Sequence, residues 1–340
     1  MSSIDNTDNS EVTTFDYMKA ITFNNTGNIK DVLSITETDV PEISPGEVLV
    51  KVIARPVNPS DHMFVNGQYR IKPFFPQIAG LEGSGIITDV HQTIKGFKAG
   101  DHVAFRSVGT WAEYIAVKES DLIIVDRDIP FEMSCQIALN AITAYALLEQ
   151  SKCGSGSFLL LSAGASALAG LIIQMARTKG IKTICLVRNE KQTKGLLELD
   201  AFKVLREDDT GLVHQIITDT GGSGVDAFLD AVGGPVLNKA IKVMRQGGTI
   251  ILYGRYSGEY AQLFNGDVIY RNLTINGFGI GQWLATKSQT EKSTAFAYII
   301  ELIDKKELVL PQSYIYHLED FTEALLCDQS KDSGKVILIN

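Results

Sequence analysis

Leu161-Ser-Ala-Gly-Ala-Ser-Ala-Leu-Ala-Gly170 is the stretch of sequence that decides the fold. It follows the apolar run Phe158–Leu161 and leads into the helix-like segment Leu171–Arg177. Small residues at a strand-to-helix turn let the backbone approach a pyrophosphate, whose charge is then met by the first N–H groups and the positive end of the helix. The strict G-x-G-x-x-G pattern is absent, so a tight turn that serves only helix–sheet packing is the alternative interpretation.

The region around this turn alternates strand-length apolar runs with helix-length segments. Parallel strands that are covered by helices on both faces give nearly continuous apolar runs, such as Thr249–Leu252. Six such runs predict an α/β fold with a doubly wound, Rossmann-type sheet. The predicted strands are Ser157–Ser162, Lys182–Val187, Ala201–Leu205, Val225–Ala231, Gly248–Gly254 and Leu273–Gly277.

The rest of the chain is of a different kind. From Tyr17 to about Ser120, short β-branched runs alternate with Pro, Gly and Asp clusters, which predicts mainly β structure. A helical stretch is expected from Phe131 to about Gln150, and another helix at about Glu291–Lys305. At 340 residues we expect two domains, one comprising residues 17–133 and 283–340 and the other residues 134–282. The polar residues 1–16 are expected to form a disordered tail.

Composition limits the partners of this chain. The formal net charge of −9 argues against binding to a nucleic-acid backbone. Its 4 cysteines are widely spaced without a C-x-x-C pair, which favours free thiols in a reducing compartment. The first sixteen residues contain neither Lys, Arg nor an apolar run, and no apolar stretch approaches the ~20 residues that cross a bilayer. We therefore expect a cytoplasmic protein that contacts no membrane.

The residues after the second predicted strand bear on the choice of cofactor. In folds of this type an acidic residue here holds the ribose 2′-hydroxyl of NADH, and a basic one accepts the 2′-phosphate of NADPH. The strand runs into Arg188, which predicts NADPH. Lys191 and Lys194 are candidates for the same positive patch, although a solvated helix face is the simpler interpretation, and Glu190 keeps NADH open.

Four short motifs make the chain recognisable: Asn58-Pro-Ser-Asp61, Gly80-Leu-Glu-Gly83, the small-residue turn and Ala231-Val-Gly-Gly234. Together they resemble the medium-chain dehydrogenase/reductase superfamily over nearly the whole chain. The resemblance implies a mainly β, GroES-like catalytic domain beside the Rossmann cofactor domain. Zinc-dependent members carry a catalytic Cys where this sequence has Asn58 and a His ligand where it has Leu81. A leucine cannot coordinate zinc and the four-cysteine structural lobe is missing, so we expect no metal.

Within that superfamily the chain is most similar to 2-enoyl thioester reductases and NADPH:quinone oxidoreductases. The similarity is carried by Tyr69, eight residues after the N-P-S-D motif, and by Asn140–Tyr145, Arg245–Gly254 and Asn276–Trp283. The resemblance implies that Tyr69 is the catalytic tyrosine. It also implies an NADPH site lined by Asn140, Ser166, Ala167, Leu168, Arg188, Tyr253, Gly254, Phe278 and Lys335.

This chain departs from the enoyl reductase pattern in three places. The S-G-V-G turn becomes Ser166–Ala169, and R-D-R becomes Arg188–Glu190, which removes one cation from the 2′-phosphate site. The loop Arg70–Pro76 is short, as in quinone reductases. A coenzyme A or acyl-carrier substrate therefore does not follow from the resemblance alone.

Without a metal, the expected chemistry is reduction of an activated carbon–carbon double bond. Hydride addition to the β-carbon generates an enolate, which a positioned acid protonates at the α-carbon. Tyr69 is the candidate acid, with an ordinary pocket aromatic as the alternative, and Asn58 and Ser60 are candidate substrate-pocket residues. Two rival functions are an NADPH:quinone oxidoreductase and a non-catalytic NADPH-binding sensor or structural protein. The exposed edge expected at Leu273–Asn276 favours a homodimer.

Overall fold

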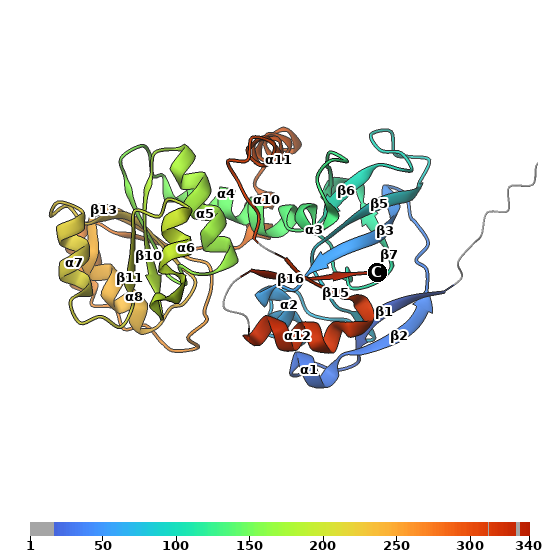
Figure 1. Ribbon diagram of the computed structural model, residues 1–340, viewed down its shortest axis with the longest axis horizontal. Helices are drawn as coiled ribbons and strands as arrows, with labels where there is room; N and C mark the ends of the chain where they lie inside the picture. Colours follow the sequence, from blue (N-terminus) through green and yellow to red (C-terminus); the bar gives the residue numbers. More distant parts are fainter. Residues whose placement is uncertain (1–16, 312, 331–333) are drawn as a thin grey trace, which may run out of the picture.

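The computed structural model describes residues 17–311, 313–330 and 334–340. The predicted disordered tail, residues 1–16, lies outside the described residues. Figure 1 shows a parallel sheet flanked by helices on the left and a mainly β lobe on the right. Helices α4 (Ile142–Ser151), α10 (Ile280–Ala285) and α11 (Gln289–Asp304) lie between the two lobes in this view.

A six-stranded parallel sheet forms the first lobe, and its strand order is β11-β10-β9-β12-β13-β14. This is the doubly wound arrangement that the sequence predicts. The strands are β9 (Phe158–Leu161), β10 (Lys182–Val187), β11 (Lys203–Arg206), β12 (Val225–Asp230), β13 (Met244–Leu252) and β14 (Thr274–Gly277). The helices of this lobe are α5 (Ala167–Thr178), α6 (Thr193–Glu198), α7 (Leu212–Asp219), α8 (Pro235–Ala240) and α9 (Asn265–Arg271).

The second lobe contains a seven-stranded and a three-stranded sheet. The larger has the order β15-β16-β3-β5-β6-β8, with β7 also paired to β3. Its strands are β3 (Glu47–Pro56), β5 (Gly83–Val90), β6 (His102–Phe105), β7 (Tyr114–Lys118), β8 (Leu122–Ile124), β15 (Ser313–His317) and β16 (Lys335–Ile339). The smaller consists of β1 (Tyr17–Phe23), β2 (Ser34–Asp39) and β4 (Gln77–Ile78), and short helices α1 (Ile29–Val32), α2 (Pro59–Val65) and α12 (Phe321–Ser330) complete the lobe.

The C-terminal strands extend the sheet that the N-terminal half begins. β16 pairs antiparallel with β3, which places Ile337 opposite Pro56. One hydrophobic cluster runs through both lobes, since Phe64 of α2 and Leu159 of β9 both belong to it. The two lobes therefore share part of their core, and the domain boundaries proposed from the sequence stay a prediction.

The helix expected from Phe131 to about Gln150 is interrupted. The chain forms α3 (Phe131–Ser134), a π-helical turn at Ile137–Ala141 and then α4. The predicted helical stretch is therefore present, and at its π-helical turn the backbone N–H of Leu139 donates to the side chain of Glu82, which precedes β5, at 2.6 Å. π-helical turns are frequent at functional sites. No helix in the described part of the chain is long and apolar enough to span a bilayer.

Candidate active site

The carboxyl ends of the central parallel strands are tied together by Asp230, the last residue of β12. Its buried carboxylate accepts hydrogen bonds from Ser162 Oγ at 2.7 Å and from the Val232 amide at 2.9 Å. Its backbone carbonyl accepts from the amides of Tyr253 at 2.9 Å and Gly254 at 3.2 Å. This edge of a doubly wound sheet is where such folds bind their ligands.

The small-residue turn lies at this edge, between β9 and α5. A Cβ atom on Gly164 would lie 2.7 Å from Cys185 Cβ, so only glycine allows the turn to pack against β10. Ser166 is the N-cap of α5, and its Oγ accepts from the Ala169 amide at 3.2 Å. The amides of Ala167 and Leu168 belong to the first helical turn, which has no intrahelical acceptors for them. The turn therefore offers hydrogen-bond donors at the positive end of a twelve-residue helix, which suits a pyrophosphate.

Two further predicted cofactor residues follow β13, and one follows β14. A Cβ atom on Gly254 would come within 2.5 Å of the Ala231 carbonyl oxygen, so the close approach of the two strand ends requires glycine. The Phe278 amide donates to the Leu252 carbonyl at 2.8 Å, and Tyr253 and Phe278 are both half-buried against the shared core. The structure thus brings Ser166, Ala167, Leu168, Tyr253, Gly254 and Phe278 to one edge of the sheet.

Arg188 lies exposed directly after β10, at the same edge. Sequence reasoning missed a second arginine, Arg206, which ends β11 in register with Val187. Its Nε and Nη2 atoms bind the Asp208 carboxylate at 2.8 Å and 2.6 Å. The sequence does contain a signal for Arg206, because this basic residue directly follows the third predicted strand, Ala201–Leu205.

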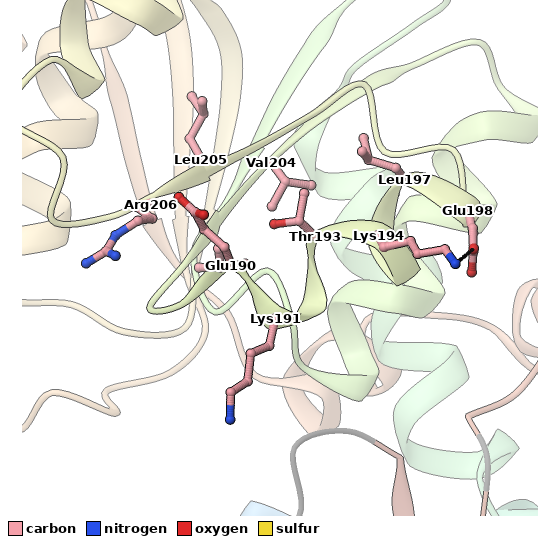
Figure 2. Close-up of a pocket in the computed structure, with 10 residues that line it drawn as sticks. Glu190, Lys191, Thr193, Lys194, Leu197, Glu198, Val204, Leu205 and Arg206 are labelled. Atoms are coloured by element: carbon pink, nitrogen blue, oxygen red, sulfur yellow. Dashed lines mark ion pairs between the residues drawn. The ribbon is translucent and has the colours of Figure 1, made fainter.

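A hollow of about 690 Å³ adjoins these strand ends, between α6 and β11. Figure 2 shows that Lys191 and Lys194, which both line it, point in different directions. Lys194 extends toward Glu198, with 3.8 Å between Nζ and Oε1. The two lysines do not converge on one point, which agrees with their interpretation as a solvated helix face.

A buried chain of polar side chains lies in the second lobe, where α2 begins. Asn58, the N-cap of α2, donates from Nδ2 to Glu82 Oε2 at 3.1 Å, and its Oδ1 accepts from Asn140 Nδ2 at 2.7 Å. Glu82 Oε1 accepts from the Leu139 amide of the π-helical turn. Asn58 and Glu82 are fully buried, whereas Asn140 is half-buried. The structure therefore joins the predicted residues Asn58 and Asn140 directly and adds Glu82, which sequence reasoning did not single out as a site residue.

Two more ionisable groups belong to this buried region. Asp61 Oδ2 accepts from the Asn58 amide at 2.7 Å, while its Oδ1 is buried without a hydrogen bond. Burial raises the pKa of Asp61 from 3.8 to about 7 and that of Glu82 from 4.5 to about 7. Lys335 of β16, only 4% exposed, opposes both shifts through its positive charge. The structure therefore places Lys335 close to buried carboxylates, and Ser60 Oγ is also buried without a hydrogen bond.

Tyr69 lines a cavity of about 300 Å³ near the π-helical turn. Leu81 and Leu139 line the same cavity, and within the described residues the phenol of Tyr69 makes no hydrogen bond. Arg106 also lines the cavity, with its Nε buried and without a partner. The other lining residues are Glu47, Ile71, Ser107, Val108, Ala116, Lys118 and Asp121. The cavity thus combines an apolar wall, a free phenol and a cation.

The zinc site of zinc-dependent dehydrogenases finds no matching donors here. The amide of Asn58 is engaged with Glu82 and Asn140, and Leu81 has no donor atom. Across residues 17–311, 313–330 and 334–340, no group of three His, Cys, Asp or Glu side chains is arranged to hold a metal ion. The residues present do not fit a catalytic zinc.

Comparisons with known proteins agree with this geometry. The family described as "Alcohol dehydrogenase GroES-like domain" matches residues 44–127, and "Zinc-binding dehydrogenase" matches residues 167–298. The mitochondrial enoyl-[acyl-carrier-protein] reductase of Dictyostelium discoideum is 29% identical over 331 residues, which cover 92% of each chain. A Bacillus thuringiensis structure, provisionally named an NADPH:quinone reductase, is 28% identical with a TM-score of 0.90 and covers 95% of this chain and 99% of its own. The Escherichia coli quinone oxidoreductase, solved with NADPH, has the same fold, with a TM-score of 0.86, 23% identity and coverage of 95% and 100%.

Both lobes of the chain are therefore accounted for by one architecture, a GroES-like lobe beside a doubly wound parallel sheet. The relatives that share it over nearly their whole length are named as oxidoreductases. This chain belongs to the medium-chain dehydrogenase/reductase family and is a nicotinamide-dependent oxidoreductase.

Proposed function

We propose that this protein uses NADPH to reduce activated carbon–carbon double bonds, in 2-enoyl thioesters or in enones and enals. One observation carries the proposal: the phenol of Tyr69 has no hydrogen bond within the described residues and lines a cavity whose apolar wall includes Leu81, where a zinc ligand would stand. The similarity to a protein named enoyl-[acyl-carrier-protein] reductase supports it.

The residues of the parallel sheet fit a dinucleotide. The free amides of Ala167 and Leu168 suit the pyrophosphate, and Arg188 suits a 2′-phosphate. Asn140 lies next to Leu139 of the Tyr69 cavity, and so it suits the nicotinamide end. The bound NADPH supplies the hydride.

The chain's own contribution is to orient the acceptor and to manage its charge and proton. Ile71, Leu81, Val108 and Leu139 give the cavity an apolar wall that excludes water from the reacting carbon atoms. Negative charge develops on the carbonyl oxygen of the acceptor, where Tyr69 can donate a hydrogen bond and Arg106 adds a positive charge. Tyr69 then supplies the proton to the α-carbon.

Replacing one hydroxyl group tests this role. Tyr69→Phe should reduce crotonyl-CoA about 10²–10⁴-fold more slowly in kcat, because general acid catalysis typically contributes this much, while the Kd for NADPH stays unchanged. Tyr260→Phe, at a tyrosine that is 96% exposed, is the control and should keep the full rate. Reduction of crotonyl-CoA by Tyr69→Phe at the wild-type rate would contradict the acid role.

A quinone is the second candidate acceptor, because the loop Arg70–Pro76 is short and a 28% identical structure is named as a quinone reductase. A quinone accepts hydride without a protein acid. Turnover of crotonyl-CoA, a 2-alkenal and a quinone panel should be compared side by side, and a hundredfold difference corresponds to about 2.7 kcal/mol in the barrier. NADPH binding without turnover of any acceptor would instead favour the non-catalytic alternative.

We further propose that two copies pair through the β14 edge as a homodimer and that the protein is cytoplasmic. β14 ends the parallel sheet, and exposed apolar side chains of α9 precede it. The matched Dictyostelium relative is named as mitochondrial, so imaging the tagged full chain distinguishes the two compartments.

A further inference from the structure

Glu82, Asn58 and Asn140 form a chain of hydrogen bonds that leads from a fully buried carboxylate to a half-buried amide. Glu82 Oε1 is occupied by the Leu139 amide at 2.6 Å. Glu82 Oε2 accepts from Asn58 Nδ2 at 3.1 Å and from Asn140 Nδ2 at 3.4 Å. Donors from two separate segments of the chain therefore converge on one buried anion.

An ionised carboxylate accepts hydrogen bonds and cannot donate them, so it sets the direction of the whole chain. Asn58 must turn its NH₂ group toward Glu82, which leaves its Oδ1 facing Asn140 at 2.7 Å. Asn140 must then turn its own NH₂ group inward, toward Asn58 and Glu82. Its carbonyl oxygen, Oδ1, is the atom left over, and it makes no hydrogen bond within the described residues.

Asn140 belongs to the π-helical turn that borders the cavity of Tyr69. Its neighbour Leu139 lines the cavity of Tyr69, the side chain assigned to the reacting end of the acceptor. The nicotinamide end of the dinucleotide must lie there too if hydride is to reach that acceptor. Both halves of that end carry donors, namely the carboxamide N–H and the ribose hydroxyls.

We propose that Glu82 is a positioning residue, which fixes the direction of the amide chain so that Asn140 presents a hydrogen-bond acceptor to the nicotinamide end of NADPH. This inference rests on the proposed function. Glu82 itself touches neither cofactor nor acceptor and acts through Asn58 and Asn140.

Glu82→Gln tests the direction of the chain, because it keeps the shape and replaces one acceptor with a donor. The new side-chain NH₂ group would face Asn58 and Asn140, so that both amides turn over and Asn140 presents NH₂. We expect the Kd for NADPH, measured by fluorescence titration at pH 8, to rise about tenfold, the order expected for one lost hydrogen bond. Binding of 2′,5′-ADP, which lacks the nicotinamide half, should stay within about twofold of wild type.

A second substitution restores the acceptor. In the double variant Glu82→Gln/Asn140→Asp, the carboxylate introduced by the second change can only accept, so an oxygen faces the cofactor again and the net charge is that of the wild type. The Kd for NADPH should return to within about threefold of wild type. A purely structural role of Glu82 requires the double variant to bind no better than Glu82→Gln, and that result would overturn the proposal.

Asn140→Ala keeps the proposal testable if Glu82→Gln does not fold, since it leaves the buried pair of Glu82 and Asn58 intact. It should raise the Kd for NADPH about tenfold and leave 2′,5′-ADP binding unchanged. An unchanged Kd for NADPH would overturn the proposal. The reduced 3-acetylpyridine analogue of NADPH, which lacks the carboxamide N–H, then identifies the donor. If Glu82→Gln does not change the Kd for this analogue, the donor is the carboxamide. If Glu82→Gln raises that Kd, the donor is a ribose hydroxyl.

Failure of the proposed function gives a different result. If wild-type protein binds no NADPH in the same titration, the proposed function is wrong and the positioning role is overturned with it. If wild-type protein binds NADPH and Glu82→Gln binds it equally well, only the positioning role is wrong.

Discussion

Arg188 is the residue on which the proposed preference for NADPH over NADH rests. It lies exposed where β10 ends, one residue beyond the register pair of Val187 and Arg206. The guanidinium of Arg206 is engaged by Asp208, which leaves Arg188 as the cation best placed for a 2′-phosphate. Glu190, two residues on, weakens the local positive potential.

Removing the Arg188 side chain should therefore act on one cofactor only. Arg188→Ala is expected to raise the Kd for NADPH at least about tenfold, since a charge-assisted hydrogen bond to phosphate is lost, and to leave the Kd for NADH unchanged. Titrating the wild-type protein and the variant with each cofactor gives the change in Kd for NADPH relative to the change in Kd for NADH. Lys191→Ala is the matched control, because Lys191 is a nearby exposed cation whose side chain does not converge with that of Lys194 (Figure 2). Equal weakening of NADPH binding by both variants would contradict the assignment of Arg188.

Some of the candidate site residues could be identified from the sequence, and others could not. Tyr69, Asn58 and Asn140 stand in short motifs, so the resemblance to known reductases marked them. Glu82 also stands in such a motif, but its role depends on partners 24 and 57 residues away and on complete burial. Local sequence carries no signal for partners so distant.

Helix α5 shows what one element contributes, because its N-terminal turn is both a structural cap and a candidate phosphate site. Ser166 Oγ satisfies the Ala169 amide and leaves the amides of Ala167 and Leu168 available. Ser166→Ala should lower the free energy of unfolding by about 1 kcal/mol and weaken NADPH binding several-fold, because the first turn frays.

Ser288→Ala is the control for that experiment. Ser288 caps α11 through a hydrogen bond from the Glu291 amide at 3.3 Å. Loss of the Ser288 hydroxyl should lower the free energy of unfolding, measured by urea denaturation, by about as much as Ser166→Ala does. The Kd for NADPH should not change. If both variants weaken NADPH binding equally, α5 has no special role at the cofactor site.

The π-helical turn at Ile137–Ala141 is the element that periodicity could not predict. Its apolar residues continue the pattern of a regular helix, since Ile137, Leu139 and Ala141 are all buried. The turn widens where the Leu139 amide leaves the helical ladder to meet Glu82. Helical periodicity predicts which residues are buried, but it does not predict which acceptor each backbone amide binds.

Over the whole molecule, the buried carboxylates make stability depend on pH. The pKa values of Asp61 and Glu82, 3.8 and 4.5 in the unfolded chain, rise to about 7 in the folded state because of burial. The folded protein thus holds more protons than the unfolded chain between about pH 4 and 7, and its free energy of unfolding should fall by a few kcal/mol as the pH rises through this window. The positive charge of Lys335 lowers both pKa values and so opposes the effect of burial, whereas the negative charge of Glu82 raises the pKa of Asp61 further.

Asp61→Asn is expected to flatten this dependence, since Asn keeps an acceptor for the Asn58 amide and carries no charge. Urea denaturation at pH 5 and pH 8 measures how much the free energy of unfolding differs between the two pH values. An unchanged difference between the two pH values in the variant would show that Asp61 does not contribute.

Assembly is the other property of the whole molecule. Ile269 and Tyr270 of α9 are 69% and 81% exposed beside the β14 edge, an arrangement that favours pairing of two copies. Tyr270→Glu should convert a dimer into a monomer, as measured by light scattering. Phe74→Glu, equally exposed at 86% but on the other lobe, should leave the dimer intact, and a wild-type monomer would refute the proposed pairing.

The sequence by itself determined the doubly wound sheet, the small-residue turn and the mainly β lobe. These features follow from hydrophobic periodicity and turn chemistry, which act over a few residues. Only the tertiary structure decided that Asn58 meets Asn140, 82 residues away, and that both depend on a buried Glu82. The physical reason is that a hydrogen bond inside the protein depends on which segments pack together and exclude water, which no local pattern records.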